Sequence, residues 1–373
     1  MISMFTIAIE TIMERHMVNF EPEGSVKAFL ARLIDAAADG STSNDVDFAE
    51  GISTIAADVL GVSRQTIHKH LTAMVKQGLI EPIGRTSGTG YKLKLLDSRR
   101  ESFRIGPELQ EDVVWRQVFA GPLRGLSQNV FDICSYGLTE MLNNAIGHSG
   151  GAGVSVALSV SLARVHLRVI DDGIGVFRKV KEGLGLADDR EAILELSKGK
   201  VTTDPQQHTG QGIFFTSRVF DQFILAANNL NLVHLAPDDE DDWLIEDDKD
   251  ANRSGTSVSM SASVWSHRTL KEVFDKYASG DDPGFSKTHI PVKLLLVGEE
   301  NLVSRSQAKR LLARFSRFEE VMLDFEGVQQ VGQAFTDEIF RVFAKEHPNI
   351  RLVTLRTNQQ INDMIARAKE SAL

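Results

Sequence analysis

Apolar residues follow a helical period near the N-terminus and then alternate with polar ones. A helix is predicted over residues 25–37, and a second one where Ile67, Leu71 and Met74 recur every three or four positions. Alternation on both sides of the glycine-rich run 84–90 predicts a β-hairpin. This part of the chain is therefore expected to form a small unit of helices and one hairpin.

The central part of the chain changes between weak and strong periodicity. Residues 97–122 have little periodicity and are expected to form a connector. An apolar stripe predicts a long helix over residues 129–148. Alternating positions then predict strands over residues 154–161 and 164–170. A helix followed by strands at this spacing suggests a second, larger domain.

Downstream of these strands the pattern is less regular. Residues 176–207 are expected to be a long irregular stretch with one short helix over 190–196. A further helix is predicted over 213–220, and a last strand begins after Gly255. The acidic run 238–250 is interpreted as a mobile loop, because its carboxylates lack the fixed turn pattern of a metal site.

From about residue 288 the chain alternates between strand-like and helix-like segments. Strands are predicted over residues 292–297, 320–325 and 350–355, and helices over 304–314, 333–344 and 358–368. This alternation predicts a separate, compact α/β unit with a mixed sheet.

Composition limits the class of protein. A chain of 373 residues with 42% hydrophobic and 25% charged residues is expected to form two or three soluble globular domains. It contains no apolar run long enough to span a membrane and no secretory signal, so a cytoplasmic location is expected. The single cysteine, Cys134, excludes an intramolecular disulfide, and we interpret it as a buried structural thiol.

Charge is distributed unevenly along the chain. The net charge of −10 argues against a protein that coats nucleic acid, but it permits a small basic head. Residues 63–94 have one acidic residue, Glu81, and the basic residues Arg64, Lys69, Lys76, Arg85, Lys92 and Lys94. A local excess of this kind favours DNA as the partner.

The spacing within this basic region is typical of a helix-turn-helix. Ala57 is small where two helices would cross, and Gly61 suits the left-handed turn between them. Ser63 can cap the second helix. Its exposed side would then present the candidate DNA-binding residues Arg64, Gln65, Thr66, His68 and Lys69. Lys69, together with Arg85 and Lys92 of the hairpin, would contact phosphates. A winged helix that binds protein instead of DNA is the alternative.

Two motifs contain candidate catalytic and ligand-binding residues. Glu140 and Asn144 lie four residues apart on the predicted long helix, so they share one face. Asp171 ends a predicted strand and is followed by Gly173 and Gly175. No G-x-x-x-x-G-K-[ST] motif is present, which excludes the ordinary P-loop.

These two motifs, the run Gly210-Gln-Gly212 and the pair Gly255-Thr256 occur in the order of the four boxes of the GHKL superfamily. The chain resembles this superfamily over roughly residues 129–264. The first box is most similar to those of anti-sigma-factor kinases and hydrolysing ATPases. The resemblance implies a GHKL α/β sandwich, with a mixed sheet and helices on one face, that binds ATP and Mg²⁺.

The resemblance also implies a role for each motif residue. Asn144 would bind Mg²⁺ and Glu140 would act as the catalytic base. Asp171 would accept a hydrogen bond from the adenine amino group, and Thr256 would reach the adenine edge.

The glycines and the neighbouring polar residues complete this picture. Gly173 and Gly175 would let the backbone pass close to the base, and Gly210 and Gly212 would hold phosphates at a helix N-terminus. Residues 176–207 would be the lid. His148 is interpreted as a structural or helix-end histidine, and Lys198 and Lys200 as solvated lid charges.

The segment Leu323-Asp324-Phe325 before a helix resembles the STAS domains of anti-anti-sigma factors. Those domains accept phosphate on a serine after the strand, but here residues 331–335 contain no hydroxyl group. Thr336 is the nearest hydroxyl residue, about one helical turn away. Phosphorelay within the chain is therefore not expected.

Three domains are expected from these patterns: a winged helix-turn-helix over 1–97, a GHKL ATP-binding domain with its N-terminal connector over 98–270, and a STAS-like α/β domain over 285–373. The expected function is that of an ATP-responsive, DNA-binding transcriptional regulator. A homodimer and a protein partner at the STAS-like domain are also expected. The alternatives are a serine/threonine protein kinase that acts on a STAS or sigma-factor partner, and a binding-only protein whose partner is a polypeptide.

Overall fold

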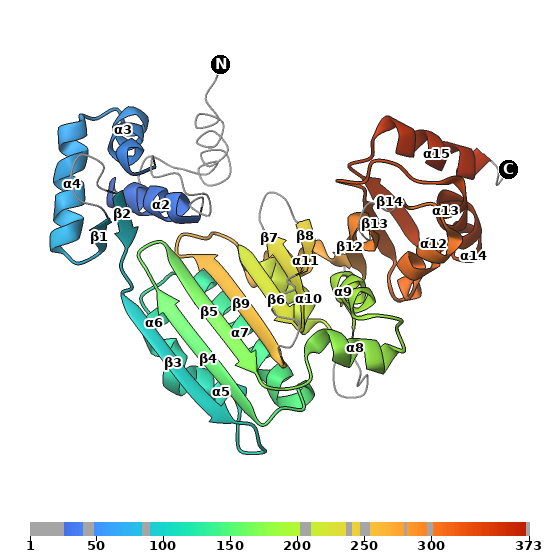
Figure 1. The fold of residues 1–373 in the computed structure, drawn as a ribbon, viewed down its shortest axis with the longest axis horizontal. Helices are drawn as coiled ribbons and strands as arrows, with labels where there is room; N and C mark the ends of the chain where they lie inside the picture. Colours follow the sequence, from blue (N-terminus) through green and yellow to red (C-terminus); the bar gives the residue numbers. More distant parts are fainter. Residues whose placement is uncertain are drawn as a thin grey trace.

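The computed structural model describes residues 26–39, 48–83, 90–201, 210–235, 241–246, 254–279, 282–296 and 301–370. The protein is α+β and has several units. Figure 1 shows a small N-terminal unit and a C-terminal unit on opposite sides of a large central sheet.

The N-terminal unit contains three helices and a hairpin: α2 (Val26–Asp39), α3 (Phe48–Leu60), α4 (Arg64–Lys76), β1 (Ile80–Ile83) and β2 (Gly90–Leu93). Gly61 has the left-handed φ of +62° in the turn between α3 and α4. Ser63 Oγ accepts a hydrogen bond from Thr66 N at 3.2 Å and so caps α4. Ile67 and Leu71 are fully buried in the core of this unit. The predicted helices and hairpin are confirmed here.

The central sheet has the strand order β3-β4-β5-β9-β6-β7-β8, and all neighbouring strands are antiparallel. These strands are β3 (Asp97–Arg104), β4 (Gly153–Val160), β5 (Arg164–Asp171), β6 (Gln222–Ala227), β7 (Leu230–Leu235), β8 (Asp241–Glu246) and β9 (Thr256–Ser263). The strands predicted after the long helix and after Gly255 are confirmed.

Helices cover one face of this sheet. The long helix α7 (Gln128–His148) and α10 (Gly212–Val219) lie behind the strands in Figure 1. Three short helical segments, α5 (Glu111–Val114), η1 (Trp115–Phe119) and α6 (Ala120–Leu123), precede α7. Along β4, Val154, Val156 and Leu158 are buried toward the helices, whereas the intervening positions are only half-buried. This alternation explains why β4 and α7 could be predicted from their apolar spacing.

Two predictions in this region were wrong. Residues 97–104 do not form an irregular connector; they form the edge strand β3, whose charged and mostly exposed side chains hide the apolar alternation. The acidic run was expected to be a loop, but its residues 241–246 form β8. Its residues 238–240 and 247–250 lie outside the described residues.

The buried end of β8 explains why acidic residues form a strand. Asp242 accepts bidentate hydrogen bonds from Arg218 of α10, both at 3.0 Å, and bonds His234 of β7 at 2.8 Å. Burial alone would raise the pKa of Asp242, but the Arg218 guanidinium and His234 hold it well below its usual value. We call these three residues the α10 anchor.

The segment after β5 is helical. It forms α8 (Val176–Leu184) and α9 (Asp189–Lys198), and we call residues 176–201 the lid segment. The helix predicted over residues 190–196 is confirmed as α9, but residues 176–184, which were expected to be irregular, form α8. Gly185, with a φ of +66°, ends α8, and Asp188 caps α9. Residues 202–207 of the expected lid lie outside the described residues.

The C-terminal unit has a three-stranded parallel sheet of β12 (Lys287–Pro291), β13 (Glu320–Asp324) and β14 (Arg351–Leu355). All strand pairs of the central sheet are thus antiparallel, and both strand pairs of the C-terminal sheet are parallel. The short helix α11 (Leu270–Lys276) and the strand pair β10 (Ala278–Ser279) and β11 (Asp282–Phe285) connect the central sheet to this unit.

The helical segments of the C-terminal unit are η3 (Val292–Leu295), α12 (Arg305–Leu312), η4 (Phe315–Arg317), α13 (Gln333–Asp337), η5 (Glu338–Phe343), α14 (Ala344–Glu346) and α15 (Gln359–Glu370). The strand predicted over 292–297 was wrong, because Val292–Leu295 is a 3₁₀ helix and the strand ends at Pro291. A short apolar run does not distinguish strand from helix.

Within the described residues, no helix combines the length and the apolar character that a membrane crossing requires.

Cys134 of α7 is fully buried, and burial, with a smaller effect of Asp221, raises the pKa of its thiol to about 12. The interpretation of Cys134 as a buried structural thiol is confirmed.

Candidate functional site

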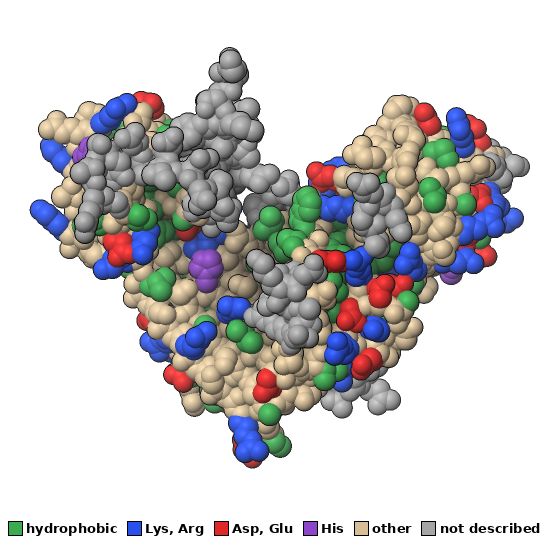
Figure 2. All heavy atoms as spheres, viewed as in Figure 1, with side chains coloured by type: hydrophobic (Ala, Val, Ile, Leu, Met, Phe, Trp, Pro, Cys, Tyr) green, Lys and Arg blue, Asp and Glu red, His purple; other side chains and the backbone are tan. Residues whose placement is uncertain are grey.

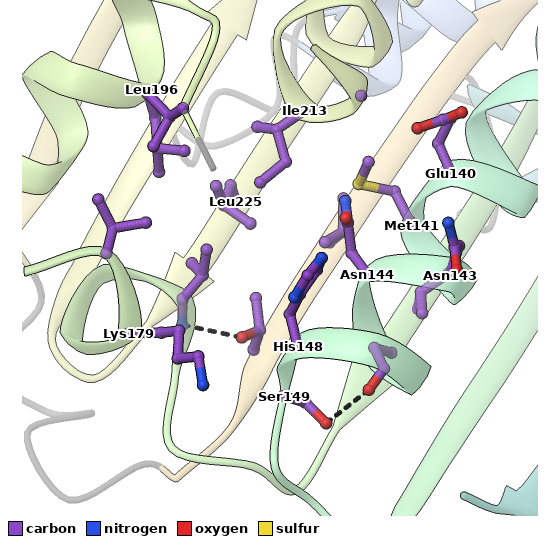
Figure 3. Close-up of a pocket in the computed structure, with 18 of the residues that line it drawn as sticks. Glu140, Met141, Asn143, Asn144, His148, Ser149, Lys179, Leu196, Ile213 and Leu225 are labelled. Atoms are coloured by element: carbon purple, nitrogen blue, oxygen red, sulfur yellow. Dashed lines mark hydrogen bonds between the residues drawn. The ribbon is translucent and has the colours of Figure 1, made fainter. Parts of the chain in front are cut away.

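One side of α7 borders a pocket. Glu140, Asn144 and His148 follow one another at intervals of four residues, and in Figure 3 their side chains project from the same side of the helix. Leu196 and Ile213 lie on the opposite side of the pocket in this view. The pocket contains about 1100 Å³ of empty space, including open solvent at its mouth.

The ends of β5 and β9 meet at the pocket. Asp171 Oδ1 accepts hydrogen bonds from Gly173 N at 2.9 Å and Thr256 N at 3.2 Å. Thr256 Oγ1 in turn accepts one from Val176 N at 3.0 Å. Burial raises the pKa of Asp171, and the two backbone donors only partly oppose this effect. The pocket therefore has a buried acid at its strand end.

Two glycines lie on the far wall of the pocket, and close backbone approach requires glycine at the first of them. Gly210 has a φ of +69°, and a Cβ atom there would overlap the backbone of Val201. A Cβ atom on Gly212 would overlap Glu140 Oε2. Gly212 begins α10, so the α10 N-terminus directly faces the α7 carboxylate.

The structure brings most of the predicted ligand-binding residues together. The pocket is lined by Glu140, Asn144, Asp171, Gly175, Gly210, Gly212 and Thr256, which come from separate segments of the chain. Gly173 does not line the pocket; it packs against the backbone of Ser149.

Five polar residues that line the pocket were not predicted as site residues: Asn143, His148, Ser149, Lys179 and Gln211. His148 had been interpreted as structural, yet it lines the pocket, and Lys179 of α8 does so too. The position of Lys179, four residues after Gly175, could have indicated it, because a helix that begins at residue 176 brings its first turns to the glycine turn. Apolar residues, including Val169, Leu225 and Val258, form the rest of the wall.

A magnesium nucleotide in this pocket would have to be held by the polar groups that line it. Asn144 Nδ2 is buried and has no hydrogen-bond partner, so the protein leaves this donor unsatisfied. In the described part of the chain, no group of three or more His, Cys, Asp or Glu side chains could hold a metal ion. A hard cation here would therefore need the Asn144 oxygen and oxygens of the ligand itself.

Lys198 is buried and Lys200 is half-buried, which corrects the interpretation of both as solvated lid charges. Lys198 is 1% exposed and lies 2.5 Å from Glu195 Oε1. Its Nζ also donates to the carbonyls of Arg310 and Ala313, both at 3.0 Å. Lys200 Nζ donates to the carbonyl of Arg317 at 2.7 Å. Both lysines therefore contact the C-terminal unit.

The candidate DNA-binding residues divide into three groups. Arg64, Gln65, His68 and Lys69 are exposed on α4, whereas Thr66 is half-buried, with its hydroxyl 3.0 Å from that of Ser63. Lys92 forms a salt bridge of 2.5 Å with Glu81. Arg85 lies outside the described residues. Figure 2 shows Lys and Arg side chains along the outer edge of the N-terminal unit, where Figure 1 places α4.

Thr336 of the C-terminal unit is fully buried. Its hydroxyl bonds the carbonyls of Gly332 at 3.3 Å and Gln333 at 3.2 Å. A phosphoryl group could reach this oxygen only if α13 were unpacked. The geometry thus agrees with the expectation that this threonine is not a phosphate acceptor.

Comparison with known proteins identifies one part of the chain. A protein-family model described as a STAS-like domain of unknown function (DUF4325) matches residues 307–362. The C-terminal unit therefore contains a STAS-like domain, as predicted. No curated protein matches the chain.

Proposed function

We propose that this chain is an ATP-binding, DNA-binding transcriptional regulator of the winged-helix and GHKL type, in which binding of Mg-ATP changes the arrangement of the domains. One observation supports it above all: seven of the eight residues expected at an ATP site, from four separate segments, line one pocket. Their order along the chain also agrees with the GHKL boxes.

Different residues of the pocket would bind different parts of Mg-ATP. Asp171 would accept a hydrogen bond from the adenine amino group, since its Oδ1 is already held by backbone donors. Gly210 and Gly212 would offer backbone N–H groups to phosphates at the start of α10. Bound Mg²⁺ would neutralise phosphate charge, and Asn144 would contribute an oxygen ligand to it.

Glu140 would act on a water molecule or a hydroxyl group near the γ-phosphate. It lies one turn before Asn144 on the pocket side of α7, within reach of the α10 N-terminus. A carboxylate at this position can orient and deprotonate an attacking group. Slow hydrolysis would then reset the switch.

The exposed residues of α4 would be the DNA-binding surface. Arg64, His68 and Lys69 lie on its solvent side, while Ile67 faces the core. The helix N-terminus and these basic groups suit the major groove and its phosphates. A palindromic operator would suit a homodimer.

Isothermal titration calorimetry with Mg-ATP tests the nucleotide site. We expect the wild type to bind and the variants Asn144→Ala and Asp171→Ala to lose at least tenfold in affinity, since each removes a polar contact to the ligand. Asp132→Ala is the matched control, because Asp132 lies on the same helix but bonds Gln128 outside the pocket. If the wild type gives no binding heat, the proposal is wrong.

The main alternative is a serine/threonine protein kinase that acts on a STAS or sigma-factor partner. The position of Glu140 in the pocket is compatible with it, and the burial of Thr336 argues against that threonine as the acceptor. Labelled γ-phosphate separates these functions: label transferred to a partner protein supports a kinase, and free labelled phosphate alone supports an ATPase switch. Under both schemes Glu140→Gln should bind ATP and lose turnover.

A further inference from the structure

We propose that Arg314 and Arg317 of the STAS-like domain are positioning residues of the nucleotide pocket, so that this domain sets the affinity for ATP through the lid segment. This inference rests on the proposed function and identifies which domain is coupled to the site and by which side chains.

The end of the lid segment forms part of that wall. Leu196 and Val201 line the pocket together with Gly210. Val201 N donates to the Gly210 carbonyl at 3.0 Å, and Gly210 has no room for a side chain against Val201. The position of residue 201 therefore determines the position of the glycine turn that leads into α10.

The turn before Val201 has a backbone that needs external support. Gly199 has a φ of +80° and Lys200 a φ of +55°. Left-handed backbone is unfavourable for a lysine and persists only where surrounding contacts stabilise it. Here the Lys200 carbonyl accepts hydrogen bonds from Arg317 Nη1 at 2.8 Å and from Arg314 Nη2. Lys200 Nζ bonds the Arg317 carbonyl in return. The two arginines thus hold the turn in place.

A second group of contacts joins α9 to the same domain. Glu195 lies 3.3 Å from Arg314, and Glu191 lies 3.3 Å from Arg310. The Lys198 carbonyl accepts a hydrogen bond from Thr288 Oγ1 at 2.7 Å, in addition to the bonds that Lys198 Nζ makes. Because Glu195 and Lys198 are almost fully buried, these contacts are desolvated and depend strongly on geometry. Figure 1 shows α9 beside β12 of the C-terminal unit.

An aromatic row gives a parallel connection. Phe214 lines the pocket, its ring lies 4.6 Å from that of Phe285, and Phe285 lies 5.5 Å from Phe318 of the STAS-like domain. Lys200 Nζ lies 4.8 Å from the centre of the Phe318 ring. The pocket wall and the STAS-like domain therefore share a packed core at this junction.

The N-terminal unit has a different attachment. Arg164 Nε donates to Asp35 of α2 at 2.9 Å, and Arg32 lies over the ring of Trp265 at 4.7 Å. Arg164 begins β5 and Asp171 ends it, so this attachment is about 23 Å from the pocket end of the strand. The contacts that border the pocket thus come from the C-terminal side.

Coupling of this kind must act in both directions. If the arginines favour the geometry that binds ATP, bound ATP must favour docking of the STAS-like domain onto α9. Loss of the arginine contacts should then weaken nucleotide binding even though neither arginine touches the pocket.

Calorimetry with Mg-ATP on the full chain tests this inference. We expect Arg317→Gln and the double variant Arg314→Ala/Arg317→Ala to bind Mg-ATP about tenfold more weakly, within the usual range of coupling between sites. Arg317 is exposed, so Arg317→Gln should keep the fold even if the double variant does not. Arg351→Ala is the matched control, because Arg351 pairs with Glu320 on the same domain and should leave the affinity unchanged.

Hydrogen exchange provides a readout that a purely structural role would not change. Mg-ATP should protect the amides of residues 305–317 in the wild type and in Arg351→Ala, and this protection should be lost in Arg317→Gln. If the wild type binds ATP but Arg317→Gln binds equally tightly and keeps this protection, only the coupling is wrong. If the wild type does not bind ATP, the proposed function fails and the coupling fails with it.

Discussion

Asp171 combines two properties that determine its behaviour. One of its oxygens is held by the backbone of Gly173 and Thr256, and burial raises its pKa. A carboxyl group with a raised pKa stabilises the folded state at low pH, and this stability is lost as the pH rises through the raised pKa. At neutral pH the ionised Asp171 therefore costs the folded protein some stability.

The substitution Asp171→Asn should separate stability from binding. An amide cannot ionise, so the variant should melt no lower than the wild type at pH 7, and any advantage should shrink as the pH falls below the raised pKa of Asp171. Under the proposed function, binding of Mg-ATP should weaken about tenfold or more, because an NH₂ donor would replace the oxygen that we propose accepts a hydrogen bond from the adenine amino group. Melting scans between pH 4 and pH 8 and calorimetry would measure both effects. Equal affinity for ATP would contradict the role of Asp171.

Among single residues, seven of the residues that line the pocket could be predicted from the sequence, but the hydrogen-bond partners of Lys198 could not. Asp171 and Thr256 stand at strand ends, and Glu140 and Asn144 are one helical turn apart, so local spacing indicates them. The burial of Lys198 depends on carbonyls of residues 310 and 313, more than a hundred positions away. No local pattern contains that information.

The helix α10 is the element on which the pocket depends most directly. Its first residue, Gly212, lines the pocket, and Arg218 near its other end belongs to the buried α10 anchor. Asp242 and His234 hold this end from β8 and β7. The edge of the sheet thereby helps to keep α10 in position.

Removal of the anchoring carboxylate should be costly. Asp242→Asn leaves the Arg218 guanidinium buried without its counter-charge, so we expect the free energy of unfolding to fall by about 3–5 kcal/mol. Asp275→Asn should change it by less than about 1 kcal/mol, because Asp275 pairs with Lys271 on the exposed side of α11. Urea unfolding would measure both. A loss below about 1 kcal/mol for Asp242→Asn would show that the α10 anchor is not required.

The elements that the sequence predicts well are those with one clear buried face. The helix α7 and the strands β4 and β5 bury every residue of a regular stripe. The edge strands β3 and β8 were missed because charged residues occupy them, and Asp242 is buried only through its partners on other elements. Pairing across a sheet, rather than local propensity, determines these two strands.

The whole molecule is acidic, yet its N-terminal unit presents basic side chains on α4. If this surface binds DNA, affinity should depend on salt because phosphate contacts release counterions. Lys69→Ala should weaken binding and lower the slope of log K against log salt by about one. Lys345→Ala, an exposed lysine of the C-terminal unit, should leave both unchanged.

Gel-shift titrations with genomic fragments at several salt concentrations, with and without Mg-ATP, would measure these effects. A nucleotide-dependent shift is expected if the arrangement of the domains follows the occupancy of the pocket. The absence of any shift by the wild type would remove DNA from the proposed function. The STAS-like domain would then be the remaining surface for a macromolecular partner.

The isolation of Cys134 has a practical consequence. Its thiol is fully buried, and burial raises its pKa to about 12. It should therefore not react with maleimide dyes or spin labels while the protein stays folded. A cysteine introduced on α4 or α15 would then be the only thiol that reacts, and Cys134 would not have to be replaced. Paired probes at these two places would report, in solution, whether the outer units move when Mg-ATP is added.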